Sequence, residues 1–162
     1  MKFTHDVIVI GAGAAGLTAA GGCAMFGLKV ALIERADMGG ECLNNGCVPS
    51  KALITAAKRA AVANEQDRFG VQLTAARVSW AGVHAHIHRA IAEIAPHDSQ
   101  ERFEEMGCDV YRGHANFTGR RKIRVGDVDL AAPKIVIATG SAPYLPPIDG
   151  LDSVPFLTNE NI

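Results

Sequence analysis

Apolar β-branched runs alternate along the chain with stretches of small residues or helix-like spacing. The first run covers residues 7–10, and a glycine- and alanine-rich stretch follows it, with helical spacing over residues 17–26 and Gly27 at its end. A second run covers residues 29–34 and finishes in a carboxylate. Continuous apolar runs of this length are typical of buried parallel strands. The pattern therefore predicts a strand, a helix and a second parallel strand, which together make a β-α-β unit.

Further along, the pattern predicts a longer excursion and a return to the sheet. Helical spacing covers residues 49–64, 79–94 and 97–106, with Ser79 as an N-cap and Trp80 as an anchoring apolar contact. Between the first two we expect a loop with a short extended piece at residues 69–71. Strand-like runs return at residues 109–112 and 134–138, and residues 122–125 and 128–130 predict a hairpin. The fold class is therefore α/β, with a parallel sheet, a long-helix excursion and a small antiparallel insertion.

Composition narrows the class of protein. The chain has 162 residues, 48% of them hydrophobic and 20% charged, with a formal net charge of −1. These values fit one compact domain and give no basic surplus for nucleic acid. Residues 7–28 carry no charge, but six glycines and a leading strand-like run argue against a membrane span. Without a secretion signal, four cysteines indicate cytoplasmic thiols rather than a secreted disulfide framework.

A glycine motif joins the first predicted strand to the first helix. Gly11, Gly13 and Gly16 are spaced as GxGxxG, with roles in a tight turn, in backbone approach to a pyrophosphate and in helix–strand packing, respectively. Glu34 lies 18 residues beyond Gly16, where a carboxylate can accept hydrogen bonds from ribose hydroxyls. The motif predicts a dinucleotide site at a helix N-terminus, and by itself it does not separate FAD from NAD.

The other candidate chemistry is a cysteine pair at the start of the second predicted helix. Cys42 and Cys47 are five positions apart, and in a regular helix their Cα atoms would be roughly 8–9 Å apart. A disulfide tolerates only about 7 Å, so pairing requires a break, and Asn45-Gly46 tolerates positive φ. Lys51 follows Cys47 by one turn of a helix that can begin near Pro49. A cation and a helix N-terminus both favour a thiolate, which is the arrangement of a redox-active dithiol.

The stretch GGECLNNGCVPSKAL resembles the redox-disulfide signature of the flavin-dependent pyridine nucleotide–disulfide oxidoreductases, which include dihydrolipoyl dehydrogenase, glutathione reductase and mercuric reductase. The resemblance covers essentially the whole chain but only about the first third of such an enzyme. It implies that residues 1–150 are the N-terminal part of an incomplete, Rossmann-like FAD-binding domain. Residues 151–162 would be a linker toward an NAD(P)H-binding domain that lies outside this sequence. It also implies a homodimer as the full-length protein.

In the resembling family, NAD(P)H reduces FAD, the flavin reduces the disulfide, and the dithiol reduces the substrate. The resemblance implies that Cys42 and Cys47 form that disulfide, with Cys47 nearest the flavin and Cys42 as the interchange thiol, while Cys23 and Cys108 stay unpaired. Lys51 would stabilise negative charge on the reduced flavin. The residues expected to bind the cofactor are Gly11, Gly13, Ala14, Ala15, Gly16, Glu34, Arg35, Gly40, Glu41, Cys42, Cys47, Lys51, Gly113, His114, Ala115, Ala138, Thr139, Gly140 and Ser141.

Some alternatives stay open. Glu41 departs from the threonine that many relatives carry, and we expect its negative charge to oppose thiolate formation. An acid at this place favours a mercuric-reductase-like enzyme, with dihydrolipoyl dehydrogenase close behind; the terminal substrate, a small molecule or a metal ion, and the choice of NADH or NADPH stay undecided. A non-catalytic FAD- or NAD-binding redox sensor is the alternative class. His84 and His88 share a helical face, which we interpret as polar surface rather than as metal ligands.

Overall fold

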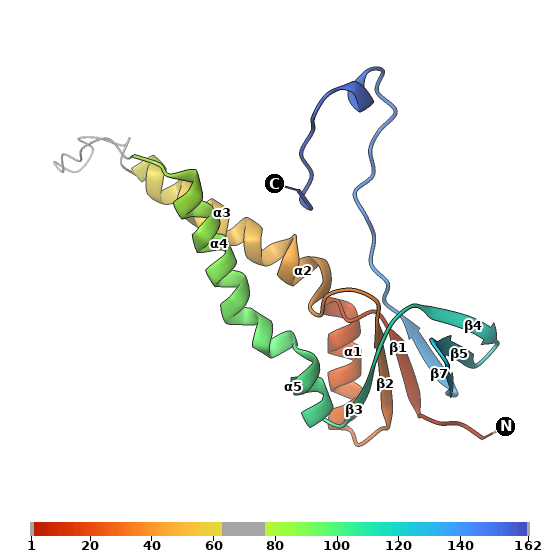
Figure 1. The fold of residues 1–162 in the computed structure, drawn as a ribbon. Helices are drawn as coiled ribbons and strands as arrows, with labels where there is room; N and C mark the ends of the chain where they lie inside the picture. Colours follow the sequence, from red (N-terminus) through yellow and green to blue (C-terminus); the bar gives the residue numbers. More distant parts are fainter. Residues whose placement is uncertain (1, 63–76, 162) are drawn as a thin grey trace.

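The computed structural model describes residues 2–62 and 77–161, and Figure 1 shows their arrangement. The predicted β-α-β unit is confirmed as β1 (Val7–Ile10), α1 (Ala14–Met25) and β2 (Val30–Glu34). β3 (Cys108–Arg112) pairs with β2, and β7 (Lys134–Ile137) pairs with β1, all in parallel. The sheet order is β3-β2-β1-β7, so two strands from the second half of the sequence flank the first β-α-β unit, one on each side.

Two apolar cores lie on opposite faces of this parallel sheet, because alternate side chains of a strand point to opposite faces. On one face, Val7 and Val9 pack with Leu17 of α1 and Phe103 of α5 (Gln100–Glu105). On the other face, Ile8, Ile10 and their neighbours pack against the antiparallel sheet. Each face of the parallel sheet therefore has its own cover, as expected for buried strands with continuous apolar sequence.

The antiparallel sheet consists of β4 (Ala115–Gly119), β5 (Lys122–Val125) and β6 (Val128–Ala131). The predicted hairpin is confirmed as β5 and β6, which pair in register. β4 was not predicted as a separate strand, and it pairs with the outer edge of β5. Ile123 and Leu130 are buried and face the parallel sheet, which explains the alternation of apolar and polar residues in β5 and β6.

The helical excursion begins earlier in the sequence than predicted. α2 (Gly40–Asn44) and α3 (Cys47–Val62) precede and include the expected start at residue 49, and the extended piece expected at residues 69–71 lies outside the described residues. α4 (Trp80–Ile94) follows, and Ser79 caps it by accepting a hydrogen bond from the Gly82 amide at 3.3 Å. Trp80 is 56% exposed, so it does not act as an apolar anchor among residues 2–62 and 77–161.

α3 and α4 pack against each other and extend away from the sheets (Figure 1). A 3₁₀ turn, Ala95–Asp98, contains Pro96 and leads into α5, which ends before Gly107 as predicted. After β7 the chain runs without a strand or α-helix to residue 161, with one 3₁₀ turn at Leu151–Ser153. Among residues 2–62 and 77–161, no helix has both the length and the apolar character that crossing a bilayer requires.

Candidate dinucleotide and dithiol site

The carboxyl ends of the four parallel strands meet at one edge of the sheet. Three backbone hydrogen bonds connect the segments that leave this edge: Gly11 N to Ile33 O at 2.8 Å, Ala138 N to Ile10 O at 2.8 Å, and Gly113 N to Glu34 O at 2.9 Å. Open α/β sheets bind ligands outside this edge. The predicted glycine loop, the Glu34 carboxylate and the segments that begin at Gly113 and Ala138 are therefore brought together.

Two glycines of the loop are required by the protein itself. Gly11 has a φ of +101°, and a Cβ atom there would lie 2.2 Å from the Ala138 carbonyl oxygen. A Cβ atom at Gly16 would lie 1.8 Å from the Gly11 carbonyl oxygen. The predicted tight turn and close helix–strand packing are confirmed by these contacts.

Gly13, the middle glycine, is different. Its φ is −81°, which any residue adopts, and a Cβ atom there would meet only the Gly40 Cα at 3.8 Å. No contact with the described residues requires a glycine at this position, so the space beside Gly13 is available to a ligand. Behind it, α1 begins without a side-chain cap and without an acid in its first turn, and Ala14 and Ala15 are exposed. The first amides of α1 are therefore free to bind an anion.

Glu34 is buried, with 9% of its surface exposed, and backbone amides hold both of its carboxylate oxygens. Oε2 accepts a hydrogen bond from Ala12 N at 2.6 Å, and Oε1 accepts one from Ala36 N at 2.8 Å. A carboxylate has about four acceptor positions, so each oxygen keeps capacity for a ribose hydroxyl. The sequence did not reveal that Glu34 also fixes the glycine loop.

The dithiol segment docks directly on the glycine loop through a second pair of glycines. Gly39 and Gly40 have φ values of +84° and +56°, and Gly39 N donates to Ala12 O at 2.9 Å. A Cβ atom at Gly40 would lie 2.6 Å from the Gly13 Cα. The Gly-Gly pair therefore allows two backbone segments to touch, and it brings α2 to the loop that follows β1.

The break between the two cysteines forms in a way that the sequence did not predict. Cys42 lies in α2 and Cys47 is the first residue of α3, with Asn45 between them at φ −131° and ψ −5°. Neither Asn45 nor Gly46 has a positive φ, so that prediction is wrong. Gly46 is needed for space instead, because a Cβ atom there would lie 2.9 Å from the Glu41 carbonyl oxygen. The positive φ angles occur before the pair, at Gly39 and Gly40.

Both cysteines are free thiols in this structure and their side chains interact. A hydrogen bond with the Cys47 side chain raises the pKa of Cys42, burial raises it further, and the positive charge of Lys51 lowers it. The role predicted for Lys51 beside Cys47 and the flavin stays a prediction. Cys23 and Cys108 are also free thiols, and the Cys42–Cys47 disulfide stays a prediction.

Glu41 makes a side-chain contact that the sequence did not predict. Among the described groups that shift the pKa of Cys42, the Glu41 carboxylate does not appear. Its Oε1 instead accepts a hydrogen bond from Asn159 Nδ2 at 3.0 Å, and Asn159 belongs to the segment that follows β7. The expectation that this carboxylate opposes thiolate formation in the dithiol stays a prediction.

The other predicted residues lie around the same edge. Arg35 is exposed just after Glu34, and Ala115 begins β4. Gly113 and Gly140 have positive φ, and a Cβ atom at Gly140 would meet nothing within 4 Å. The remaining ones are exposed: His114, Thr139 and Ser141. Their contact with a cofactor stays a prediction.

Sequence reasoning missed Arg112, whose guanidinium donates a hydrogen bond to the Ala36 carbonyl. It also missed Asn159. An arginine at the last position of a strand that ends at this edge is the signal that could have identified Arg112, whereas nothing in the local sequence marks Asn159.

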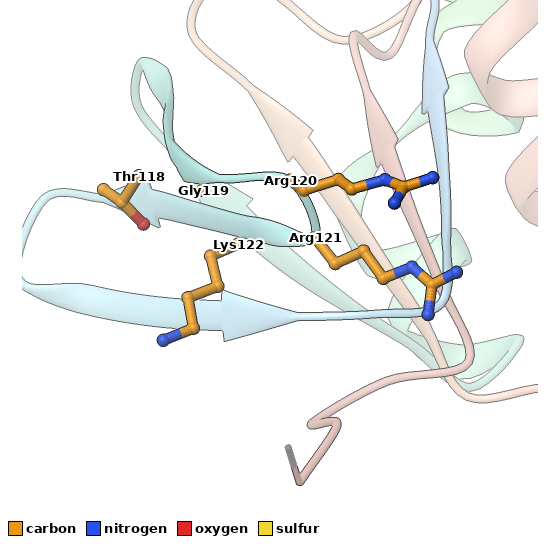
Figure 2. A pocket seen from close by; sticks show the side chains of 5 residues that line it. All are labelled: Thr118, Gly119, Arg120, Arg121 and Lys122. Carbon is orange, nitrogen blue, oxygen red and sulfur yellow. The ribbon is translucent and has the colours of Figure 1, made fainter.

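A separate hollow of about 400 Å³ lies at the β4–β5 turn and is lined by Thr118, Gly119, Arg120, Arg121 and Lys122 (Figure 2). None of the predicted site residues lines it, and the Arg121 guanidinium lies 6.0 Å from the centre of the Phe3 ring, beside the chain before β1. Across residues 2–62 and 77–161, no group of three or more His, Cys, Asp or Glu side chains is arranged to hold a metal ion.

The fold and the paired thiols define a class: an α/β dinucleotide-binding unit joined to a dithiol. Over residues 5–161 the chain matches the pyridine nucleotide-disulphide oxidoreductase family, and it belongs to that family. It is 32% identical over 158 residues to a mercuric reductase of Lysinibacillus sphaericus, covering 98% of this chain and 29% of the relative. It is 33% identical over 165 residues to a dihydrolipoyl dehydrogenase of Synechocystis sp., covering 98% of this chain and 35% of the relative.

Among solved structures, the Cu(II) complex of the HOCl-induced flavoprotein disulfide reductase RclA from Escherichia coli is similar, with a TM-score of 0.73 and 27% sequence identity. The match covers 93% of this chain and 31% of that chain. The chain thus spans about a third of the length of the proteins that it matches. The α/β fold class with its parallel and antiparallel sheets is confirmed.

Proposed function

We propose that this chain is the FAD-binding part of an NAD(P)H-dependent flavoprotein disulfide reductase, in which electrons pass from NAD(P)H through FAD to the Cys42–Cys47 pair and on to substrate. The observation that carries the proposal is the direct contact between the glycine loop and the dithiol segment, where a Cβ atom at Gly40 would lie 2.6 Å from Gly13. A dinucleotide held by this loop would lie next to the thiols. Membership of the family supports the same assignment.

The residues present fit the ADP half of FAD. The open space at Gly13 and the uncapped start of α1 suit a pyrophosphate, and the two partly occupied oxygens of Glu34 suit the ribose hydroxyls. The chemistry that FAD supplies when bound is reversible two-electron transfer. The chain's own contribution there is to bind, to orient and to bring the dithiol close.

The dithiol holds two electrons and two protons when reduced and releases both when the disulfide forms. Cys47 would face the flavin, and Cys42 would be the thiol that meets substrate. A thiolate is the nucleophile in such exchange, so the Lys51 charge favours reaction by lowering the pKa of Cys42. The hydrogen bond that the Cys42 thiol makes to Cys47 favours the protonated form of Cys42 and raises its pKa.

For the terminal substrate we propose a metal ion of the mercuric type, since thiolates bind soft cations and Glu41 adds a negative charge near the entrance to the pair. Relatives named mercuric reductase support this choice. A disulfide substrate of the dihydrolipoyl dehydrogenase kind is the alternative, supported by relatives of similar identity. As a full-length protein we expect a cytoplasmic homodimer.

A titration of the dithiol in the presence of FAD tests the proposal. The chain would be incubated with excess FAD, and the flavin absorbance followed as the thiols are reduced stepwise and counted. We expect the visible spectrum to change with the reduction of the Cys42–Cys47 pair and to lose that response in Cys47→Ser. Cys23→Ser is the matched control and should respond like the original chain. Thiols that titrate with no effect on the flavin would indicate the alternative class, a redox-sensor module.

The chain alone should not turn over. No second GxGxxG occurs after Gly16, so no NAD(P)H site is recognisable in it. With FAD and NADPH under anaerobic conditions, we expect flavin bleaching no faster than that of free FAD. Clearly faster bleaching would mean that a hydride-delivery site lies within these residues.

A further inference from the structure

The turn between β2 and α2, residues 35–39, connects the proposed ribose site to the dithiol segment. At its start, Ala36 N donates to Glu34 Oε1 at 2.8 Å, and at its end Gly39 N donates to Ala12 O at 2.9 Å. Glu34 Oε2 accepts from Ala12 N at 2.6 Å. The orientation of the Glu34 carboxylate therefore depends on the positions of two separate segments, the glycine loop and this turn.

Arg112 holds the second of these segments in place. It is the last residue of β3, its Cα lies opposite that of Glu34 in the strand register, and Gly113 N donates to Glu34 O at 2.9 Å. From this position the Arg112 guanidinium donates to the Ala36 carbonyl. Both backbone groups of Ala36 are thus bound, its N–H by Glu34 and its C=O by Arg112.

We propose that Arg112 is a positioning residue of the ADP subsite. By fixing the Ala36 carbonyl it keeps the Ala36 amide on Glu34 Oε1, and so keeps the carboxylate aimed for ribose hydroxyls. Without the guanidinium, Oε1 loses a fixed donor, and a carboxylate held only through Oε2 is free to turn about that bond. This inference rests on the proposed function, because it concerns how the same dinucleotide site recognises its ligand.

The test compares two probes, ADP and 2′,3′-dideoxy-ADP, titrated into the chain at millimolar concentration and followed by NMR chemical shifts. For the unmodified chain we expect ADP to bind roughly tenfold more tightly, the effect of hydrogen bonds from hydroxyls to a charged acceptor. In Arg112→Leu this preference should fall to about threefold or less. An Arg120→Leu variant removes an exposed guanidinium that lines the hollow in Figure 2 instead, and it should keep the full preference.

A Glu34→Gln background separates positioning from direct contact. If Arg112 acts through Glu34, then Arg112→Leu causes no further loss of ribose preference in Glu34→Gln. An undiminished preference in Arg112→Leu, or equal weakening for both probes, would overturn the positioning role, the second result indicating a guanidinium that binds phosphate directly. A chain that binds neither probe would overturn the ADP subsite itself, and with it the role of Arg112.

Discussion

The sheet edge and the helical pair α3–α4 differ in where their contacts come from. At the edge, Gly11, Gly16 and Gly40 are each so close to another backbone segment that a Cβ atom would lie 2.6 Å or less from it. In α4 no residue is fully buried, and in α3 only Ala52 is. Contacts between backbone segments of the chain determine the conformation of the sheet edge. The helical pair, by contrast, leaves much of its apolar surface exposed.

This difference leads to a prediction about which parts of the chain contact a partner. The backbone contacts at the sheet edge are made between segments of this chain, so the conformation of the edge does not depend on a second chain. Ile54 and Trp80, by contrast, are 51% and 56% exposed. Ile54 lies on α3 and Trp80 on α4, and large apolar side chains exposed on neighbouring helices favour association with other protein where they form one patch.

The largest effect on stability should come from adding a side chain where two backbone segments touch at the sheet edge. Gly16→Ala would place a Cβ atom 1.8 Å from the Gly11 carbonyl oxygen, so α1 must move away from β1. We expect the free energy of unfolding to fall by about 3–5 kcal/mol, measured by urea denaturation.

Two glycines give matched controls for that variant. Gly22→Ala, in the same helix, places its Cβ atom in open space and should raise stability by about 0.5–1 kcal/mol. Gly13→Ala should change stability by about 1 kcal/mol or less while it weakens ADP binding, since its Cβ atom would occupy the proposed pyrophosphate space. Equal destabilisation by Gly13→Ala and Gly16→Ala would contradict the distinction between the two positions.

A smaller effect is expected at the helical pair. We predict that the chain self-associates through its exposed apolar side chains, and that Ile54→Glu combined with Trp80→Glu weakens association about tenfold by sedimentation velocity. The free energy of unfolding of the monomer should change by about 0.5 kcal/mol or less, as for other surface substitutions. Ala57→Glu with Ala81→Glu adds the same charges at exposed positions of the same helices and should have less effect on association.

The smallest effect concerns the dithiol, which lies between the two regions. Because the pKa of Cys42 is raised, its thiolate should form at higher pH than that of an ordinary cysteine, and its alkylation rate should rise correspondingly late. Cys47→Ala removes the largest cause and should move the midpoint down, whereas Lys51→Met removes a lowering charge and should move it up. Peptide mass spectrometry after alkylation at a series of pH values measures both shifts, and movement in the same direction in both variants would contradict this assignment.

The same comparison explains what the sequence could predict. The order of strands and helices and the glycine loop depend on short patterns, and they were predicted well. The Arg112–Ala36 and Asn159–Glu41 hydrogen bonds join residues far apart in sequence, so the sequence does not show which residues are partners, although the position of Arg112 at a strand end marks it as a candidate. The sequence predicted positive φ at Asn45-Gly46, but the structure has it at Gly39-Gly40. Packing of Gly40 against Gly13, which joins two distant segments, decides the conformation there.

The contact between Ala138 and the glycine loop has a consequence for biosynthesis. The Gly11 backbone lies directly against the Ala138 carbonyl, and Ala138 N donates a hydrogen bond to Ile10 O. The contacts of the glycine loop are therefore complete only after β7 has paired with β1. The separation from residue 10 to residue 138 is 138 − 10 = 128 residues. At ~5–20 residues per second, a ribosome needs about 6–26 s to make that length. For all but the first few residues of that interval the nascent chain already contains every residue of the phosphate loop, yet the loop lacks its contact with Ala138.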